Sequence, residues 1–328
     1  MSIKEIAAKL NVSKSTVSLV INGKAEQGRI SEALAKRIMD YVDSIGYKPN
    51  ALAKSLATGK SRTIGLIVEN IGDSFFGPIA LYIEEYLRKY NYHVLYSSTL
   101  NDEKLANTIL DTMLDKYVDG IIMAPTLGQE EQVQKLIDTK LPLVVFDRRI
   151  PSLETNYIGT DNYSASKRAV QYLFECGYKS IGMITIDSKQ VQMLDRLRGY
   201  REVVDSNNST EDILQIPYNL VGDSRKAMID SFLSENSFDA LYFSTNYLCV
   251  SALKVLKANK KHKHYGMITF DDHEIFELNL PTISCMRQPI EEIAKQIVVT
   301  LLGQINDHKK PFDDIIIPSE LIIRESTQ

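Results

Sequence analysis

Apolar residues recur every three to four positions in two short runs near the start of the chain, residues 3–10 and 14–21. This spacing predicts two short amphipathic helices. Ser2 and Glu5 can form a capping box for the first helix, and Ser13 can cap the second. The turn between the runs is of the kind that joins two crossed helices, so the pattern predicts a helix-turn-helix.

The second of these helices has the surface expected of a helix that enters the major groove of DNA. Its outward positions are mostly small and polar, so it can approach base edges and phosphates closely. The predicted DNA contacts of this segment are Ser13, Lys14, Ser15, Thr16, Ser18, Leu19 and Asn22. A third apolar-periodic run, from Ser31 to about Ile45, completes a head of three helices.

From residue 62 the pattern changes to fully apolar strands that alternate with amphipathic helices. The predicted strands are 63–69, 92–98, 120–124, 143–146, 180–185, 213–217, 240–244, 265–270 and 314–323. The predicted helices are 75–89, 103–116, 130–138, 162–176, 194–205, 225–234, 247–258 and 290–306. Continuous apolar strands between helices indicate parallel sheets covered on both faces. The body is therefore expected to be two similar doubly wound halves.

Charge is distributed unevenly along the 328 residues, whose net charge is −4. Residues 1–62 hold 11 Lys and Arg against 5 Asp and Glu, and the remainder holds 27 against 37. A basic head of +6 is attracted to phosphate, whereas an acidic body of −10 is repelled from it. This distribution favours a modular DNA-binding protein.

Two segments resemble one known family. Residues 12–22 (VSKSTVSLVIN) are similar to the recognition segment of the lac repressor/purine repressor (LacI/GalR) family, and residues 46–57 (GYKPNALAKSLA) are similar to its hinge helix. The resemblance implies that two hinge helices order side by side in the minor groove of operator DNA, with Leu56 as an apolar wedge and Lys54 beside it. The predicted DNA contacts of the hinge are Asn50, Lys54 and Leu56.

The pattern and the resemblance together predict an α/β protein with a periplasmic-binding-protein-like body. The expected domains are a helix-turn-helix DNA-binding domain at 1–48, a hinge helix and linker at 49–61, and an effector-binding and dimerisation domain at 62–328. Pro-rich crossings are expected near 151–161, 281–289 and 311–318. They would divide the body into an N-terminal subdomain (about 62–160 and 284–314) and a C-terminal subdomain (about 161–283 and 315–328).

Ligands of doubly wound sheets bind at the carboxyl ends of the strands. Several predicted strands end in carboxylate, amide, guanidinium or aromatic side chains, a set that suits a sugar or a nucleobase. The resemblance assigns effector contacts to Phe75, Phe76, Asp147, Arg196, Leu220, Asn246 and Asp271. Two departures from the family are Tyr247, where relatives usually have Asp, and Leu19, where relatives often place a polar base-reading residue.

The leading hypothesis is a transcriptional regulator, expected to be a repressor, that binds a pseudo-palindromic operator as a homodimer and responds to a small effector, a sugar or sugar derivative. Control of the same regulator by a protein corepressor or by a nucleobase remains open. A solute-binding protein would need a signal peptide and no basic head. An enzyme is not expected, because the sequence has no Gly-rich phosphate loop, metal-ligand cluster or nucleophile elbow, and we predict no cofactor and no metal.

The remaining sequence features bear on the compartment and the assembly. No apolar run approaches the roughly 20 residues of a membrane span, and the chain starts with a capped helix rather than a secretory signal. Cys176, Cys249 and Cys285 are scattered, as expected of reduced thiols. We therefore expect a cytoplasmic protein. No heptad repeat follows the last predicted strand, so a dimer is expected rather than a tetramer.

Overall fold

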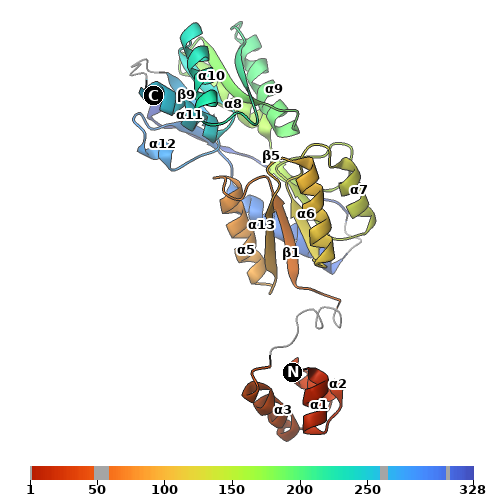
Figure 1. Ribbon diagram of the computed structural model, residues 1–328. Coiled ribbons are helices and arrows are strands. Elements are labelled where there is room, and N and C mark those ends of the chain that lie inside the picture. The colour runs from red at the N-terminus through yellow and green to blue at the C-terminus, as the bar shows by residue number, and fades with distance from the viewer. Residues whose placement is uncertain (1, 48–58, 259–264, 308–310) are drawn as a thin grey trace. The chain divides into compact units, whose positions relative to one another are not determined.

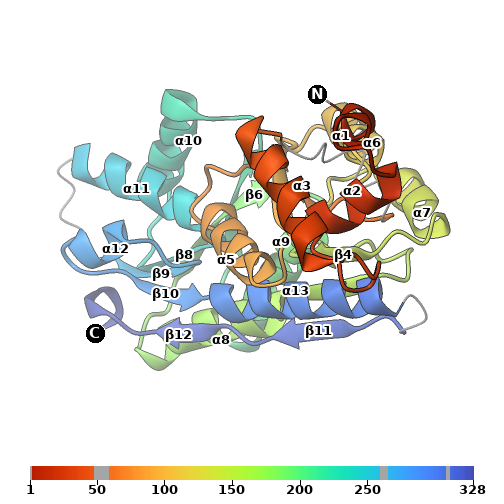
Figure 2. The ribbon, with the colours of Figure 1, turned by 90° about the horizontal axis from the view of Figure 1, so that it is seen from below.

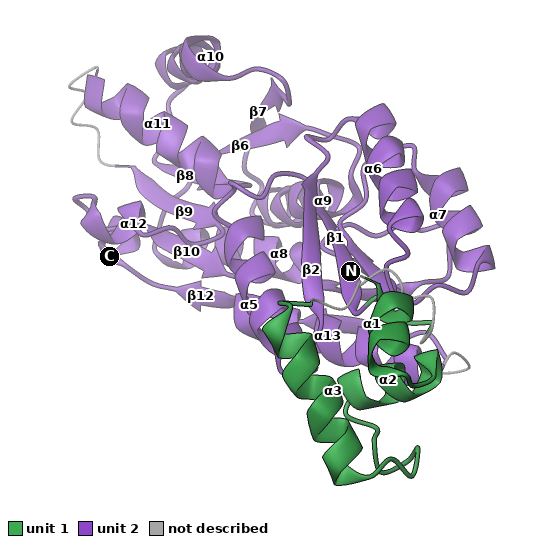
Figure 3. Ribbon diagram, turned by 60° about the horizontal axis from the view of Figure 1, so that its bottom comes forward, with its two compact units in different colours: residues 1–61 green, residues 62–328 purple. Residues whose placement is uncertain are grey.

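The computed structural model describes residues 2–47, 59–258, 265–307 and 311–328. The chain forms two compact units, Met1–Ser61 (the head) and Arg62–Gln328 (the body), which Figure 3 distinguishes by colour. Each unit has its own hydrophobic core. No helix in the described ranges is long and apolar enough to cross a membrane.

The head consists of α1 (Ile3–Leu10), α2 (Lys14–Ile21) and α3 (Glu32–Ser44), which confirms the three predicted helices. The hydroxyl groups of Ser2, Ser13 and Ser31 cap them, because each accepts a hydrogen bond from a backbone N–H in the first turn. The side chains that form the buried core are Ile6, Ala7, Val17, Val20, Ile38 and Val42.

The first half of the body is a six-stranded parallel sheet in the order β11-β5-β4-β3-β1-β2. Its strands are β1 (Thr63–Val68), β2 (His93–Ser98), β3 (Gly120–Met123), β4 (Leu143–Phe146), β5 (Asn156–Thr160) and β11 (Asp314–Ile317). One face is covered by α5 (Phe76–Arg88) and α13 (Ile290–Asn306), and the other by α6 (Glu103–Asp115) and α7 (Glu130–Asp138).

The second half has a sheet in the order β12-β10-β9-β8-β6-β7, parallel except for β12. Its strands are β6 (Ile181–Asp187), β7 (Asp212–Pro217), β8 (Ala240–Phe243), β9 (Gly266–Phe270), β10 (Ser284–Arg287) and β12 (Glu320–Ile322). Its helices are α8 (Asn162–Glu175), α9 (Val191–Ser206), α10 (Gly222–Glu235), α11 (Asn246–Ala258), α12 (Ile275–Leu278) and the 3-10 turn Glu325–Thr327. Figure 1 shows α8 to α11 on this half and α5 to α7 on the first.

The two doubly wound halves are as predicted, but the last strand is not. The predicted strand 314–323 is two strands, β11 in the first sheet and β12 in the second, which lie end to end in Figure 2. Pro318 interrupts them, because proline has no N–H to donate to a strand ladder. Residues 315–317 therefore belong to the first half, not to the second as predicted.

The other subdomain boundary also needs a correction. Residues 284–287, predicted in the N-terminal subdomain, form β10, which pairs with β9 in the second sheet. Neither β5 nor β10 was predicted as a strand, since both fall in the Pro-rich stretches that were interpreted as crossings. The chain passes between the halves at Asp161, at Gln288–Pro289 and at Pro318–Ser319, each at or near the end of one of the three predicted stretches.

Candidate functional site

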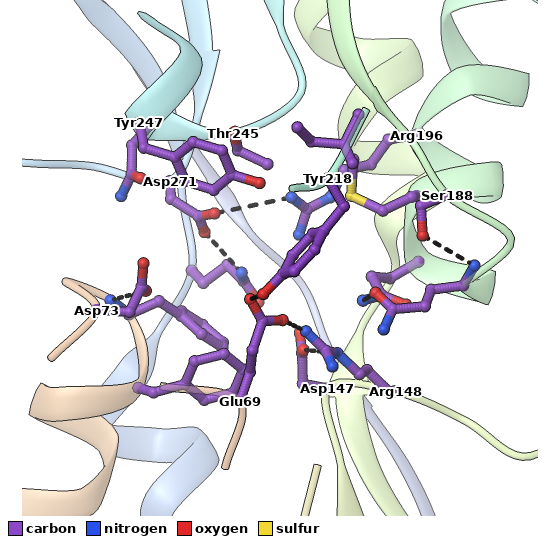
Figure 4. Close-up of a pocket in the computed structure, with 18 residues that line it drawn as sticks. Glu69, Asp73, Asp147, Arg148, Ser188, Arg196, Tyr218, Thr245, Tyr247 and Asp271 are labelled. Atoms are coloured by element: carbon purple, nitrogen blue, oxygen red, sulfur yellow. Dashed lines mark hydrogen bonds and ion pairs between the residues drawn. The ribbon is translucent and has the colours of Figure 1, made fainter. Parts of the chain in front are cut away.

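The carboxyl ends of strands from both sheets meet at a narrow cavity of about 80 Å³ in the body (Figure 4). The first half contributes Glu69 after β1 and Asp147 after β4, and the second half contributes Tyr218 after β7 and Asp271 after β9. Gln288, on the second crossing, also lines it. The cavity is thus where the strand-end rule places a ligand site in this fold.

An aspartate follows the fourth strand of each half and faces this cavity. Asp147 and Asp271 both have a left-handed backbone, with φ of 59° and 66°. Asp adopts this region more readily than most residues with a side chain. The backbone N–H of Asp147 still donates to Ile158 of the neighbouring strand (3.1 Å), and that of Asp271 donates to Met286 (2.9 Å). The two carboxylates are therefore held at the ends of their sheets by ordered backbone.

Arg196 is the most constrained cation of the site, with a side chain only 5% exposed. Its Nε donates to Asn162 Oδ1 (2.8 Å) and its Nη1 donates to the backbone oxygen of Ser244 (2.7 Å). Nη1 is 3.7 Å from the Asp271 carboxylate, and the guanidinium lies 3.6 Å above the centre of the Phe270 ring. These contacts fix the guanidinium beside Asp271.

Gly199 is what lets α9 bring Arg196 to this position. A Cβ atom at Gly199 would lie 2.6 Å from the backbone oxygen of Tyr163 on α8. Only a residue without a side chain permits this close approach of two helices. The close packing of α8 and α9 sets the distance between Arg196 and Asn162, the first residue of α8.

A chain of contacts crosses the cleft through Glu69. The guanidinium of Arg148 forms an ion pair with the Glu69 carboxylate, and the Tyr218 hydroxyl donates to the other oxygen of that carboxylate (Figure 4). Arg148 Nη1 also donates to Asn101 Oδ1 (3.2 Å). Because Glu69 and Tyr218 belong to different halves, their contact joins the two sides of the cleft.

Two further hydrogen bonds cross the cleft directly. Gln190 Nε2, from the second half, donates to Asn101 Oδ1 in the first (3.0 Å). Asn246 Nδ2, at the start of α11, donates to Ser74 Oγ in the loop before α5 (2.9 Å). The polar rims of the two halves are therefore bonded to each other in this structure.

Gln288 connects the cavity to the crossings of the chain. Its Nε2 donates to Asp271 Oδ1 (2.6 Å), and its Oε1 accepts from the Thr160 hydroxyl at the end of β5 (2.7 Å). Gln288 is itself at the second crossing, and Thr160 adjoins the first. A change at Asp271 thus bears directly on the segments that join the halves.

Burial dominates the electrostatics of the site. Burial, opposed by Arg196 and reinforced by the nearby carboxylates of Asp271 and Asp73, raises the pKa of Asp147 to about 7. Burial also raises the pKa of Asp271 and lowers that of Arg148 to about 10. No group of three or more His, Cys, Asp or Glu side chains within the described ranges is placed to hold a metal ion.

Most of the predicted effector residues line the cavity, namely Phe75, Phe76, Asp147, Arg196, Asn246 and Asp271. Leu220 does not. It packs, partly buried, on the core beneath α10 and α11, because the chain turns back after β7 with the Leu220 N–H bonded to the Pro217 oxygen (2.9 Å). Tyr218 faces the cavity in its place, and it directly follows a predicted strand, a signal that could have identified it.

The other lining residues that the prediction omitted have weaker sequence signals. Asp73, Gln190 and Gln192 lie in loops or at a helix start, where their orientation depends on the fold of the loop. Gln288 lies in a stretch that was interpreted only as a crossing. Glu69 and Arg148 stand at strand ends, so the strand-end rule does locate them.

The predicted DNA contacts of the head lie on or beside α2. The Ser13 hydroxyl accepts from the Thr16 backbone N–H (3.0 Å), and Lys14 and Asn22 are exposed. Leu19 is partly exposed and lies against the loop after α2, since a Cβ at Gly28 would be 2.7 Å from Leu19 Cδ1. The predicted hinge contacts Asn50, Lys54 and Leu56 lie outside the described residues.

Comparison with known proteins assigns the chain to a family. Residues 2–50 match the family described as "Bacterial regulatory proteins, lacI family", and residues 64–276 match "Periplasmic binding protein domain". The chain belongs to the lacI family. This lacI-family member is a DNA-binding transcriptional regulator, which confirms the family predicted from the two sequence motifs.

Individual relatives cover nearly the whole of this lacI-family chain. The ribose operon repressor of Haemophilus influenzae is 28% identical, over 99% of this chain and 98% of the relative. The sucrose operon repressor of Lactococcus lactis subsp. lactis is 29% identical, over 93% and 94%. The lac repressor dimer bound to operator and the anti-inducer ONPF has a TM-score of 0.86 at 18% identity, with 100% and 99% covered, and this likeness shows the shared fold.

Proposed function

We propose that this lacI-family regulator is a repressor that binds a pseudo-palindromic operator as a homodimer and is switched by a sugar or sugar derivative in the cleft of its body. The observation that carries the proposal is the combination of two sites in one chain. The head presents an exposed polar helix, α2, and the body has a cavity lined by polar side chains of both halves. A protein that acts on operator DNA works in the cytoplasm.

The DNA site of the proposal is the outer surface of α2. Lys14 and Ser15 are exposed in its first turn, and Asn22 is exposed at its end. The N-terminal residues of a recognition helix contact base edges, whereas its neighbours contact phosphate. The hinge contacts predicted at Leu56 and Lys54 would add binding in the minor groove.

The proposed dimer is inferred from exposed apolar side chains on both halves of the body. Leu278 at the end of α12 and Leu280 after it are 81% and 86% exposed, and Leu81 on α5 is 55% exposed. Large apolar side chains that are exposed together in one surface patch often mark a protein–protein interface. A second copy of the chain is the occupant that a pseudo-palindromic operator requires, since twofold symmetry of the DNA matches that of a dimer.

The effector site is the cleft cavity. Phe75 and Phe76 offer apolar surface, while Asp147, Asp271 and Asn246 offer acceptors and donors for hydroxyl groups. This combination of apolar faces and a few ordered polar groups suits a sugar. The names of the ribose and sucrose operon repressors, which align along nearly all of this chain, support the same class of ligand.

Coupling between the sites follows from the position of the cavity between the halves. An effector that replaces the direct bonds across the cleft, such as Gln190 to Asn101, changes the angle between the halves. In a dimer this alters the spacing of the two heads and hence the affinity for the operator. The coupling must be reciprocal and is typically about 1–3 kcal/mol.

The experiment starts with selection of an operator from random DNA, followed by binding measurements with and without a panel of sugars. Lys14→Ala should weaken operator binding, whereas Lys135→Ala, on α7 of the body, removes the same charge as a control. Asp271→Asn should abolish the sugar response, while the variant should still bind the selected operator in the absence of sugar. If no DNA sequence is enriched, the operator proposal fails. If DNA binds but no sugar acts, the effector proposal fails.

A further inference from the structure

We propose that the cleft selects an uncharged, hydroxyl-rich ligand and discriminates against the same ligand bearing a phosphate or a carboxylate. The inference rests on the effector site proposed above and specifies the charge of the ligand that this site prefers. Cells hold many sugars both free and as phosphate esters, so the preferred charge decides which of the two forms the regulator senses.

Carboxylates outnumber cations among the side chains that line the cavity. The carboxylates are Glu69, Asp73, Asp147 and Asp271, and the cations are Arg148 and Arg196. No Lys or His is among the described residues that line it. When these carboxylates are ionised, an anionic ligand would enter a site with an excess of negative charge, where like charges at short range and low dielectric repel strongly.

Both arginines are already engaged with protein groups. Arg148 pairs with Glu69 and donates from Nη1 to Asn101. Arg196 donates from Nε to Asn162 and from Nη1 to a backbone oxygen. A phosphate that bound the same donor atoms would have to break these buried contacts, whereas sites that bind phosphate normally keep bidentate arginine donors free for it.

Two helices begin beside the cavity, where Phe76 of α5 and Gln192 of α9 line it, and helix N-termini attract anions. A carboxylate stands before one of them, since Asp73 Oδ1 accepts from the N–H of Phe75, the residue that precedes α5 (2.8 Å). An anion that approached the start of α5 would therefore meet the Asp73 carboxylate.

Buried polar atoms that lack a hydrogen bond indicate what the ligand should carry instead. Thr245 Oγ1, Gln192 Oε1 and Arg148 Nε are buried without a hydrogen-bond partner within the described part of the chain. All three residues are more than nine-tenths buried and line the cavity. They comprise a hydroxyl, an acceptor and a donor, and ligand hydroxyl groups can satisfy each of them because they both donate and accept. A fully ionised phosphate cannot donate to Gln192.

Asp147 is the residue we expect to enforce the discrimination. Its side chain is 9% exposed, and its nearest cationic atom, Arg148 Nε, is 3.5 Å away. The carboxylates of Asp271 and Asp73 act on it as like charges, while the guanidinium of Arg196 acts in the opposite direction. A second anion beside it would be disfavoured further, while a sugar hydroxyl could donate to it.

The test is titration calorimetry of the full chain with matched ligands. The panel consists of aldoses, ketoses and disaccharides, ribose and sucrose among them, each measured beside its phosphate ester and its sugar acid. We expect a free sugar to bind and its anionic derivatives to bind at least about 100-fold more weakly. A derivative that binds as tightly as its parent overturns the inference and leaves the effector site intact. If no compound of either charge binds, the proposed effector site itself fails.

Variants locate the source of the discrimination. Asp147→Asn should reduce the ratio of sugar to sugar-phosphate affinity by about tenfold or more. Asp195→Asn is the matched control, because Asp195 lies next to Arg196 on α9, does not line the cavity and pairs with Arg198 (2.9 Å). Asp73→Asn gives a second reading of the ratio if Asp147→Asn impairs sugar binding altogether. An unchanged ratio in both cleft variants refutes the assignment to these carboxylates.

Discussion

Replacing Asp147 by Asn should stabilise the body of the protein, and the gain should grow as the pH rises. Asp147 is buried at the end of β4, and burial raises the pKa of its carboxyl to about 7 from an ordinary 3.8. Asn has the same shape without the charge, and it tolerates the left-handed backbone, φ 59°, at this position. The substitution therefore isolates the cost of a buried negative charge.

The direction of the change in stability with pH depends on whether the folded or the unfolded state binds the proton. Between pH values near 4 and 7 the folded protein holds a proton on Asp147 that the unfolded chain has released, so wild-type stability falls as the pH rises through this window. One pKa unit corresponds to about 1.36 kcal/mol, so the full difference is about 4 kcal/mol. Between about pH 5.5 and about pH 7.5 the wild type should lose about 2 kcal/mol that Asp147→Asn retains.

The assay is urea unfolding of the full chain at those two pH values. Far-ultraviolet circular dichroism is the appropriate probe because the sequence has no Trp. Subtracting the unfolding free energies of the two proteins at each pH cancels the titration of groups that do not interact with Asp147. The result that would refute the reasoning is a difference in unfolding free energy that is the same at both pH values.

Asp272→Asn supplies a control of opposite sign. Burial acts to raise the pKa of Asp272, but hydrogen bonds from Arg324 and Arg287 outweigh it and hold the pKa at about 2. The stability that this carboxylate contributes is present above the unfolded pKa and is lost only as the pH falls toward 2. Asp272→Asn should therefore destabilise the body equally at both measured pH values.

Three further predictions concern packing, capping and assembly. Gly199→Ala would place a Cβ 2.6 Å from the Tyr163 oxygen, so it should lower the stability of the body by about 1–3 kcal/mol, and an unchanged thermal midpoint would contradict this packing. Ser13→Ala removes the cap of α2 and should cost the head about 1 kcal/mol, measured as faster amide hydrogen exchange in α2. Leu280→Asp, at a side chain 86% exposed, should give monomers in sedimentation velocity, whereas Leu127→Asp, at one 47% exposed, should leave the dimer intact.

The sequence predicts the doubly wound halves well because their central strands are buried on both faces. A strand such as β1, whose residues 64–68 are all buried, must be apolar along its whole length, and this pattern is visible without a structure. The strands at or next to one edge of each sheet, β10, β11 and β12, leave weaker traces. They are short, each lies close to a proline, and only pairing with a distant strand decides which sheet each one joins.

The residues of the candidate site likewise fall into those that the apolar pattern locates and those that it does not. Asp147 and Asp271 could be located because they follow strands whose ends are fixed by the apolar pattern. Leu220 could not be excluded without the turn that begins at Pro217, although Tyr218 directly follows a predicted strand. Residues on loops are positioned by local backbone geometry that apolar periodicity does not report.

The repeated fold places equivalent residues at the cleft, but the charge of the cleft depends on one further position in each half. The fourth strand of each half ends in Phe and is followed by Asp, and each Asp has a left-handed backbone. Gly, Asn and Asp take this backbone most readily, and of these only Asp supplies a carboxylate, so conformation and chemistry select the same residue. The next residue differs. Arg148 lines the cavity and neutralises Glu69, whereas Asp272, outside the cavity, pairs with Arg287 and Arg324. The second half thus adds no cation at this position, and the cleft keeps its excess of negative charge.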